Sequence, residues 1–416
     1  MTTTTHPTDL RVNGARLMDR LTSLAEIGAI DGGGCARLAL TDADRDGRDL
    51  VTSWMRDLGL DVTVDAVGNV IGTWNTGTGP AVMTGSHIDT VRTGGKFDGN
   101  LGVLAGLEVI QTVQESGWVP PRPLAVAFFT NEEGARFAPD LMGSLAYVGG
   151  IGVEEVLGTV GIDGARVGDE LLRIGYAGPT PCPAPAPHAF VELHIEQGPV
   201  LEMEHKAIGA VTGVQGISWQ EVTIEGQSNH AGTTPMSMRH DPAFVASAIA
   251  VFLRELAARF GGNQVCTVGK IDLHPNLVNV VPARAVLTLD VRNTDEDLLR
   301  RAETEIAARL ESLAQEEGVT ITSRPLARFE PVEFAGKIIS LVESVAGSHG
   351  LSCMRLPSGA GHDAQMLARV CPTGMIFVPS HKGISHNPAE HTDTADLVAG
   401  CDVLLQVMLS LATEEG

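Results

Sequence analysis

Residues that bind metals or move protons follow three apolar runs of strand length. They are His87, Asp98, Glu132, Glu133 and His194. In open α/β sheets, ligand sites lie at the carboxyl ends of the strands. Imidazole and carboxylate groups at several strand ends therefore predict one shared site built from nitrogen and oxygen ligands.

The glycine-rich stretch Thr84–Leu107 holds the first two of these residues. His87 offers one imidazole, and Asp98 offers two oxygens, which is enough to bridge two cations. Asp89 lies two residues after His87, where its carboxylate is placed to hold the other ring nitrogen of that histidine. The alternative for this stretch alone is a buried histidine that is hydrogen-bonded to a nearby aspartate in a turn.

The pair Glu132-Glu133 ends the buried-strand pattern Leu124–Thr130. Alternate side chains at a strand end point in different directions. One carboxylate is therefore expected to bind metal, while its neighbour acts as a general base beside it. The structural alternative is that both carboxylates cap the next segment and lie in water.

A late histidine completes the set, and the loop Ser380–Glu390 supplies two candidates, His381 and His386. Spacing does not separate them. Three imidazoles and two carboxylates suit two divalent cations that share Asp98. Such a pair activates water for hydrolysis. Zinc suits these ligands best, and manganese, cobalt or nickel also fit.

Composition excludes several classes of function. The 416 residues carry a formal net charge of −22, with 29 basic and 51 acidic side chains, which disfavours nucleic-acid and anionic-membrane partners. We see no signal peptide and no run of the roughly 18–20 apolar residues that a membrane span needs. The six scattered cysteines form no Cys-x-x-Cys pair, which indicates reduced thiols and a cytoplasmic location.

The order of elements predicts an α/β fold that is split in sequence. We expect a catalytic domain over residues 1–213 and 328–416, with apolar strands flanked by helices, and a looped excursion over 150–187. Residues 214–327 alternate strands and helices in a compact α+β layout of ferredoxin-like type. Long helices are expected at Asp241–Phe260 and Asp295–Glu317 of this insertion.

Several motifs together resemble the hydantoinase/carbamoylase family of dinuclear metal amidohydrolases, which are relatives of the metallo-aminoacylases and metallo-carboxypeptidases. They are GSHIDTVRTGGKFDG, NEEGARF, ELHIEQGPVLE, SNHAGTTPM, SGAGHDA and GISHNPAE. The resemblance runs from about residue 10 to residue 412. It implies a catalytic domain with a central mixed β-sheet and an inserted lid domain that forms a homodimer.

The resemblance also implies roles for individual residues. His87, Asp98 and His194 would hold one metal, while Asp98, Glu133 and His386 hold the other. Glu132 would be the general base, Asp89 would orient His87, and His230 would stabilise the oxyanion in the partner's site. Substrate contacts would come from Gln197, Asn279, Arg292 and the backbone donors of Gly359 and Ala360. As structural alternatives, Arg292 is a surface ion pair and His230 caps a turn.

The resemblance implies cleavage of the carbamoyl C–N bond of N-carbamoyl-L-amino acids, a class of small ureido acids. Allantoate and other ureido acids, including the substrate of β-ureidopropionases, are the main alternatives. A hydrolase of acylamino acids or dipeptides and a non-catalytic metal-binding protein are further ones. The intact Glu132-Glu133 pair argues against the last of these.

Overall fold

The computed structural model describes residues 6–414, and the chain divides into two compact units. Unit 1 combines the chain up to Gly213 with the chain from Glu333 onward, and unit 2 is Val214–Val332. The second crossing point thus follows Val332, whereas the sequence placed it after residue 327.

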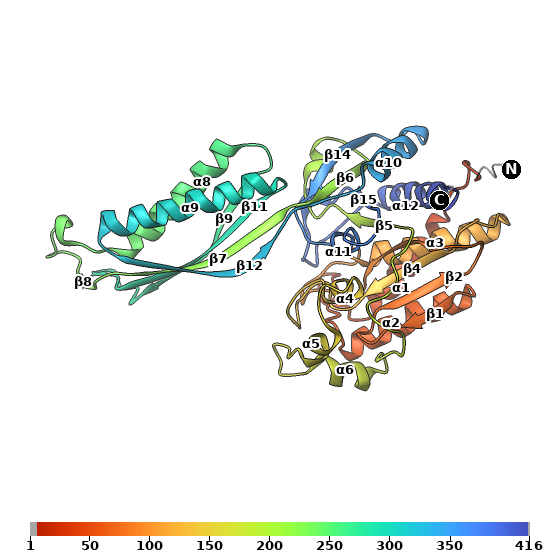
Figure 1. Ribbon diagram of the computed structural model, residues 1–416, viewed down its shortest axis with the longest axis horizontal. Coiled ribbons are helices and arrows are strands. Elements are labelled where there is room, and N and C mark those ends of the chain that lie inside the picture. Colours follow the sequence, from red (N-terminus) through yellow and green to blue (C-terminus); the bar gives the residue numbers. More distant parts are fainter. Residues whose placement is uncertain (1–5, 415–416) are drawn as a thin grey trace. The chain divides into compact units, whose positions relative to one another are not determined.

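Unit 1 is built on a nine-stranded sheet with the order β1-β2-β4-β3-β5-β15-β6-β13, in which β14 also pairs with β6 (Figure 1). Its strands are β1 Asp61–Val64, β2 Val70–Trp74, β3 Val82–His87, β4 Leu124–Phe129, β5 Ala189–Ile195, β6 Ile208–Val214, β13 Val332–Glu333, β14 Cys353–Ser358 and β15 Thr373–Val378. The central strands β4, β3, β5 and β15 are parallel, while β1, β2 and β6 pair antiparallel. The predicted central mixed sheet is therefore confirmed.

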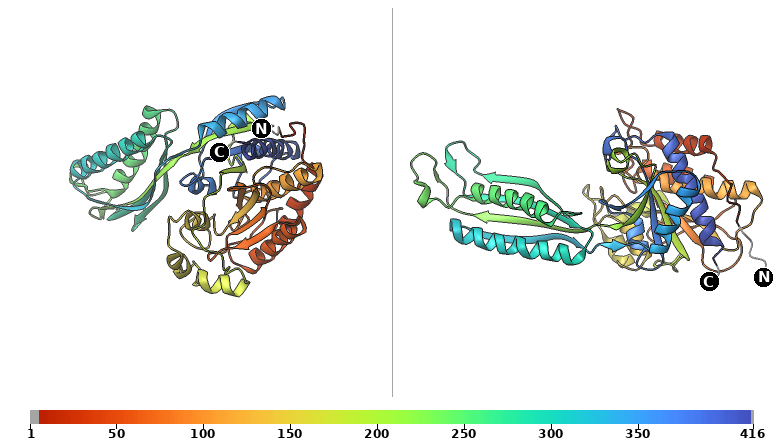
Figure 2. Two further views of the ribbon diagram at one scale, coloured as in Figure 1. Left: turned by 45° about the vertical axis from the view of Figure 1, so that its right-hand side comes forward. Right: turned by 90° about the horizontal axis from the view of Figure 1, so that it is seen from above.

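Helices flank this sheet (Figure 2). They are α1 Gly14–Glu26, α2 Asp42–Asp57, α3 Asn100–Ser116, α4 Met142–Tyr147, α5 Val153–Gly158, α6 Val167–Ile174, α7 Val200–Met203, α10 Gly336–Ser348, α11 Asp363–Leu367 and α12 Thr394–Ala412, with a 3-10 turn η2 at His381–Gly383. The expected excursion over 150–187 is not only loop, because it contains α5 and α6.

Glycine lets α3 lie directly on the sheet. A Cβ atom on Gly102 would lie 2.7 Å from the carbonyl oxygen of Leu193 and 2.9 Å from the Cβ of Ser86. Gly99, just before the helix, has a positive φ of 65°, and a Cβ there would overlap the ring of His87 at 2.4 Å. These close approaches fix the loop that carries Asp98 against the ends of β3 and β5.

One helix, α12, has the length and apolar composition of a membrane span. This differs from the sequence expectation, which found no such segment. Most of α12 is buried inside unit 1, where it packs against α1, α3 and α10 and against β3, β5 and β15. Its apolar character is that of a core helix.

Unit 2 is an antiparallel sheet of order β12-β7-β11-β9 with two long helices. Its elements run β7 Gly216–Glu225, β8 Asn229–His230, η1 Met236–Met238, α8 Pro242–Phe260, β9 Val265–His274, β10 Val280–Val281, β11 Arg284–Asn293, α9 Glu296–Glu317 and β12 Thr320–Phe329. The four long strands and two helices follow the βαββαβ order of ferredoxin-like folds. The alternating inward residues of β11 and the apolar sides of α8 and α9 form a separate core.

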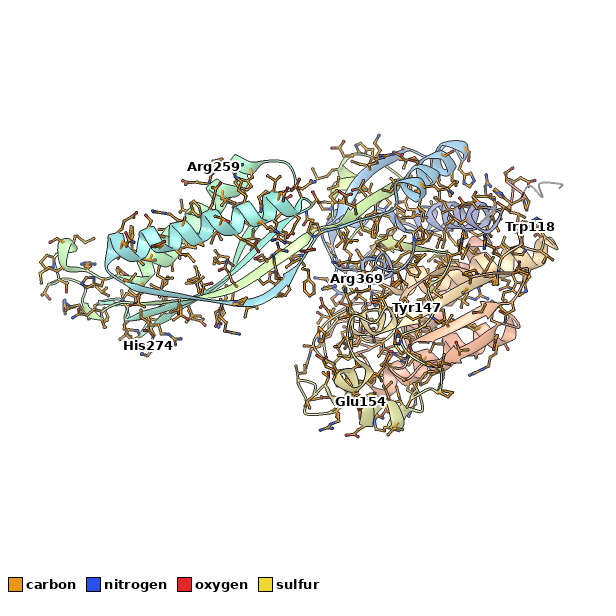
Figure 3. All side chains as sticks on the ribbon, in the orientation of Figure 1. Trp118, Tyr147, Glu154, Arg259, His274 and Arg369 are labelled. Carbon is orange, nitrogen blue, oxygen red and sulfur yellow. The ribbon has the colours of Figure 1, made fainter. Side chains whose placement is uncertain are left out.

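Figure 3 draws the side chains and labels two of unit 2, Arg259 and His274. Arg259, near the end of α8, forms an ion pair with Glu305 of α9 at 2.6 Å. His274, which is labelled in the same figure, ends β9. Among the described strands, β9 is an edge of the sheet, and its residues Val265 and Ile271 are exposed.

Candidate active site

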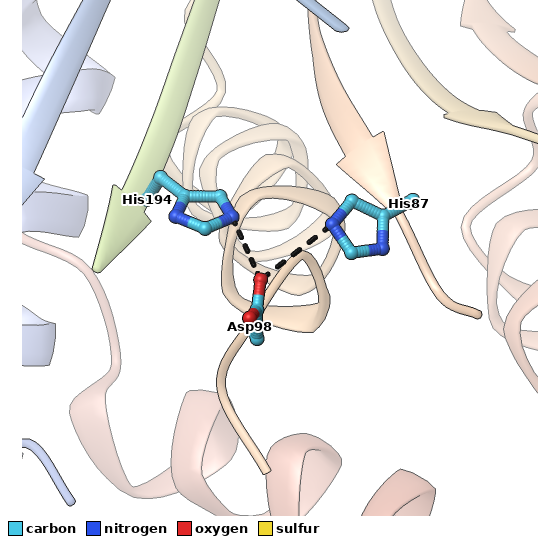
Figure 4. Close-up of side chains that lie close together, drawn as sticks. All are labelled: His87, Asp98 and His194. Carbon is cyan, nitrogen blue, oxygen red and sulfur yellow. Dashed lines mark ion pairs between the residues drawn. The ribbon is translucent and has the colours of Figure 1, made fainter. Parts of the chain in front are cut away.

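Two histidines at the ends of parallel strands converge on one carboxylate. His87 is the last residue of β3, and His194 lies near the end of β5, which pairs with β3 in parallel. Oδ1 of Asp98 lies 3.2 Å from Nε2 of His194 and 3.7 Å from Nε2 of His87 (Figure 4). All three side chains are buried, so the first predicted ligand group is assembled in unit 1.

Main-chain carbonyls fix the orientation of both rings. Nδ1 of His87 lies 2.9 Å from the carbonyl oxygen of Asp89, and Nδ1 of His194 lies 2.8 Å from that of Ile195. A carbonyl oxygen can only accept a hydrogen bond, so each Nδ1 carries the proton. Each Nε2 atom is therefore the one that can bind a metal, as in metal sites where an outer partner sets the tautomer. Nε2 of His194 also accepts the backbone N–H of Gly99 at 3.1 Å.

The role predicted for Asp89 needs a correction. Its carbonyl oxygen, and not its carboxylate, contacts the ring of His87. The carboxylate instead accepts the backbone N–H groups of Glu132 at 3.2 Å and Glu133 at 3.3 Å. Asp89 thus holds both the histidine and the glutamate pair, but through different atoms.

A second group of ligand types shares Asp98. Nε2 of His386 lies 3.4 Å from Oδ2 of Asp98 and 3.3 Å from Oε2 of Glu133. The competing candidate, His381, pairs with Glu202 instead, at 2.8 Å. The geometry therefore favours His386 over His381, which spacing alone could not do.

The two groups fit a divalent metal site. The donor atoms of His87, Asp98 and His194 lie within 4.8 Å of one another, and so do those of Asp98, Glu133 and His386. All donors are imidazole nitrogens or carboxylate oxygens, a set that suits zinc and similar divalent ions. The outer hydrogen bonds that such sites require are present on both buried rings.

Burial and charge shift the acidity of these groups strongly. Burial raises the pKa of Glu132 well above its usual range, and the nearby carboxylate of Asp363 raises it further. Burial also raises the pKa of Glu133, and the charge of Asp98 adds to the shift. Such crowded carboxylates are stabilised when cations lie between them.

The histidines respond in opposite directions. Burial lowers the pKa of His87 to about 4. Burial also acts to lower the pKa of His194, but the hydrogen bond to Asp98 and the charge of that carboxylate outweigh it and raise the pKa to about 9. Against the same burial, His194 keeps the pKa of Asp98 below its usual range. His87 is thus neutral near pH 7, as a ligand must be.

Glu132 lies beside the two ligand groups without joining either. Its Oε2 atom lies 3.4 Å from Nε2 of His87. None of the three possible ligand groups found in residues 6–414 includes it. A buried carboxyl group that is able to hold a proton next to a metal site has the properties of a general acid and base.

A small cavity of about 120 Å³ opens onto these residues. Its lining comprises His87, Asp98, Glu132, Glu133, Asp140, His194, Gln197, Ala360, Gly361, His362 and His386. The side-chain amide of Gln197, predicted to contact substrate, donates to Oδ2 of Asp98 at 2.9 Å. Its own Oε1 atom is buried and has no hydrogen-bond partner among residues 6–414, so an acceptor remains for a ligand N–H.

The N–H of Ala360, which was predicted to donate to substrate, has a partner within the chain in this structure. Its N–H donates to Oγ of Ser358 at 3.1 Å, and its carbonyl accepts from the same hydroxyl at 2.9 Å. Nε2 of His362 also lies 2.8 Å from this hydroxyl. Ala360 therefore lines the cavity, but a turn with Ser358 uses its polar groups, and Gly359 belongs to the same turn.

Sequence analysis missed Glu390, which ends the motif GISHNPAE. Its buried Oε1 accepts the N–H groups of Phe97 at 3.0 Å and Asp98 at 3.3 Å. Its Oε2 accepts from Ser385 at 3.4 Å. Glu390 thus ties the loop of His386 to the loop of Asp98. Its sequence signal is its place four residues after His386. The path of the loop decides which groups Glu390 reaches, and the sequence pattern does not give that path.

The remaining predicted residues lie in unit 2. His230 is exposed on β8, and its Nδ1 accepts the N–H groups of Gly232 at 3.0 Å and Thr233 at 3.2 Å. His230 therefore caps a turn, as the structural alternative predicted. Because Nδ1 is an acceptor, the neutral ring carries its proton on Nε2. The carbonyl of Asn279 accepts from Ala231 at 2.9 Å on the neighbouring segment.

Arg292 lies at the other end of unit 2. Its Nε and Nη2 atoms donate to the carboxylate of Asp290 at 2.9 Å, and its guanidinium lies over the ring of Trp219. The register pairs Arg292 with Ile217, whereas the opposite end of β11 begins at Arg284. The structural alternative for Arg292, an ion pair on the surface of unit 2, is thus present.

The comparisons with known proteins decide the family. Residues 83–410 match the model of peptidase family M20/M25/M40. The chain belongs to this family. The motif-based resemblance to the hydantoinase/carbamoylase amidases is confirmed by relatives that match almost the whole chain.

Three relatives of this M20 protein illustrate the match. An N-carbamoyl-L-amino-acid amidohydrolase of Rhizobium meliloti is 41% identical over 405 residues, which is 97% of both chains. An allantoate amidohydrolase of Escherichia coli K12 is 36% identical and covers 94% of this chain and 96% of its own length. A hydantoinase/carbamoylase family amidase from Burkholderia multivorans has a crystal structure with a TM-score of 0.95 and 42% identity, covering 98% of this chain and all of that one.

Proposed function

We propose that this M20 protein is a metal-dependent amidohydrolase that cleaves the carbamoyl C–N bond of N-carbamoyl-L-amino acids. The products would be the L-amino acid, carbon dioxide and ammonia. The observation that carries the proposal is the pair of ligand groups sharing Asp98, with the protonatable Glu132 beside them. The name and near-complete coverage of the Rhizobium meliloti relative support the substrate class.

We infer two divalent ions per chain, zinc before manganese, cobalt or nickel. His87, Asp98 and His194 would hold one ion, and Asp98, Glu133 and His386 would hold the other. When bound, such ions activate water and polarise the scissile carbonyl. Glu132 would take a proton from the attacking water on its carboxylate and deliver it to the leaving nitrogen. The carboxylate of Asp89 accepts the backbone N–H of Glu132 and so holds Glu132 close to the site.

Unit 2 would supply the substrate-binding residues as a lid. Arg292 and Asn279 would bind the substrate carboxylate, and the Nε2–H of His230 would stabilise the oxyanion. Eight residue steps along β11 lead from Arg284 to Arg292, a span of roughly 27 Å. Asn279 lies beyond the Arg284 end, so one chain cannot bring Asn279 and Arg292 to the same carboxylate. That part of the sequence-based assignment therefore requires two chains.

A homodimer through unit 2 would supply the second chain. The edge strand β9 runs for ten residues from Val265 to His274 and exposes Val265 and Ile271. A long edge strand with exposed apolar residues is suited to pairing with its own copy across a twofold axis. In such a dimer, His230 and Asn279 of one chain would serve the site of the other.

We propose further that the protein works in the cytoplasm on small ureido acids, without a nucleic-acid or membrane partner. All six cysteines are unpaired in the structure, which suits a reducing compartment. The charge of −22 supports the absence of polyanionic partners.

A substrate panel tests the proposal. Metal-reconstituted protein is assayed for ammonia release from N-carbamoyl-L-methionine, its D-enantiomer, allantoate and N-carbamoyl-β-alanine, with Glu132→Gln as the inactive control. We expect the L-methionine derivative to be cleaved fastest and its D-enantiomer to be inert. Preference for allantoate, the substrate named for the Escherichia coli relative, would replace the substrate while leaving the site roles intact. A protein that binds two metals and cleaves none would refute the substrate class.

A further inference from the structure

The segment that contains Asp140 folds back onto the residues that carry the general base. The side-chain amide of Asn131 donates to the carbonyl of Pro139 at 3.1 Å. The N–H of Leu141 donates to the carbonyl of Glu132 at 2.8 Å. The residues directly before and after Asp140 are therefore tied to the Asn131–Glu132 turn, and the backbone fixes Asp140 relative to the base.

Two glycines, Gly134 and Gly361, lie close to Asp140 and Leu141 in this part of the chain. A Cβ atom on Gly134 would lie 2.8 Å from the Cβ of Asp140, so these two parts of the loop are in close contact. A Cβ on Gly361 would lie 3.5 Å from the side chain of Leu141. Asp140 thus forms part of the cavity wall beside the Ala360-Gly361 segment, and all three residues line the cavity.

Asp140 differs from the other carboxylates of the cavity. Asp98 and Glu133 each face an imidazole of the ligand groups, and Glu132 lies 3.4 Å from His87. Within residues 6–414, Asp140 makes no ion pair and no side-chain hydrogen bond to another residue. Protein atoms surround it closely enough to raise its pKa, although it is open to solvent.

The other residues that line the cavity offer a substrate side chain little else to bind to. Among residues 6–414, no lysine or arginine lines it, and Ala360 and Gly361 are its only lining residues without a polar side chain. Once Asp98 and Glu133 bind metal and Glu132 serves as base, the charge of Asp140 is the one that remains without a counterpart. A carboxylate in this state favours a ligand cation that can donate charge-assisted hydrogen bonds.

We infer that Asp140 is a specificity-determining residue that receives a cationic group, an ammonium or a guanidinium, on the side chain of the N-carbamoyl-L-amino acid. This inference rests on the proposed function and narrows its substrate class. A neutral side chain of the same length would desolvate Asp140 without replacing its lost hydrogen bonds, which costs binding. The preference is therefore the difference in binding free energy between a cationic substrate, which pairs with Asp140, and a neutral one, which leaves Asp140 unpaired.

The test compares two substrates that differ only at the end of the side chain. N-carbamoyl-L-lysine and N-carbamoyl-L-norleucine have the same carbon chain, and only the former ends in an ammonium group. For the metal-loaded wild type we expect kcat/KM to favour the lysine derivative about tenfold. In Asp140→Asn this ratio should fall to about one, mainly through KM of the lysine derivative. Added salt should reduce the wild-type ratio.

A matched control removes the same charge elsewhere in unit 1. Asp57 is the exposed last residue of α2, and Asp57→Asn should leave the ratio at the wild-type value. Thermal unfolding of both variants checks that each one folds. In a second variant, Asp140→Lys, kcat/KM for N-carbamoyl-L-glutamate should exceed kcat/KM for N-carbamoyl-L-lysine.

Each outcome separates this inference from the proposed function. If the wild type cleaves both ureido substrates equally well, the role of Asp140 is refuted and the proposed function stands. If Asp140→Asn lowers both reactions by the same factor, Asp140 supports the site without selecting the substrate, and the inference is again refuted. If neither ureido compound is cleaved by the metal-loaded wild type, the proposed function itself fails.

Discussion

The two units treat their reactive side chains in contrasting ways. Unit 1 draws His87, Asp98 and His194 from separate loops and strand ends into one buried cluster. Unit 2 leaves His230 and Asn279 exposed at one end and holds Arg292 against Asp290 at the other. The contrast teaches that the candidate metal ligands come together within one unit of one chain, whereas the residues proposed to bind substrate in unit 2 lie far apart.

The largest expected effect removes the residue shared by the two ligand groups. Asp98→Ala should lower the metal content from two ions per chain to nearly none, because each group loses its common carboxylate. Activity should fall by about four orders of magnitude or more, and elemental analysis measures the metals. Retention of two ions would show that the cluster of unit 1 is not the metal site.

The next effect separates the base from the ligands. Glu132→Gln keeps the size of the side chain but removes its ability to accept a proton, so kcat should fall about a thousandfold or more. Metal content should stay at the wild-type level because neither ligand group includes Glu132. If metal is lost together with activity, Glu132 is a ligand and its assignment as base is wrong.

A mixing experiment tests whether unit 2 acts on the other chain. His230→Ala should lower kcat about a hundredfold, by loss of an oxyanion donor. Mixing it with Glu132→Gln under conditions of subunit exchange should restore about a quarter of wild-type activity, because half the dimers are mixed and each contains one complete site. No restoration in verified heterodimers would place His230 over the site of its own chain.

The smallest effect concerns the link between loops inside unit 1. Glu390→Gln keeps one acceptor for the N–H groups of Phe97 and Asp98 but loses the charge. We expect metal affinity to weaken about tenfold, measured by competition with a chelator. Glu390→Ala should weaken it further. Equal affinities in the wild type and both variants would remove Glu390 from the support of the site.

The sequence was sufficient for the parts of the site that depend on strand ends. His87 and His194 follow buried apolar runs, so their convergence was predictable once both strands were placed in one parallel sheet. Periodicity likewise predicted α8, α9 and the core strand β4. These features depend on local pattern and on general rules of sheet topology.

Other features depend on which atom of a residue makes the contact, and sequence does not carry that information. The carbonyl of Asp89, not its carboxylate, holds His87, and the hydroxyl of Ser358 occupies the N–H of Ala360. Asp140 and Glu390 reach the site through the path of their loops. Arg292 and Asn279 were assigned to one substrate group, and only the register of β11 shows how far apart they lie.

The path of the chain through the sheet also has a consequence for the order of events during synthesis on the ribosome. Strand β15, Thr373–Val378, lies between β5 and β6, although both neighbours are made more than a hundred residues earlier. Until it emerges, those two strands lack their shared partner, and the cluster lacks His386. We therefore expect a nascent chain to bind its full metal complement only after the segment from β15 to His386 has been translated.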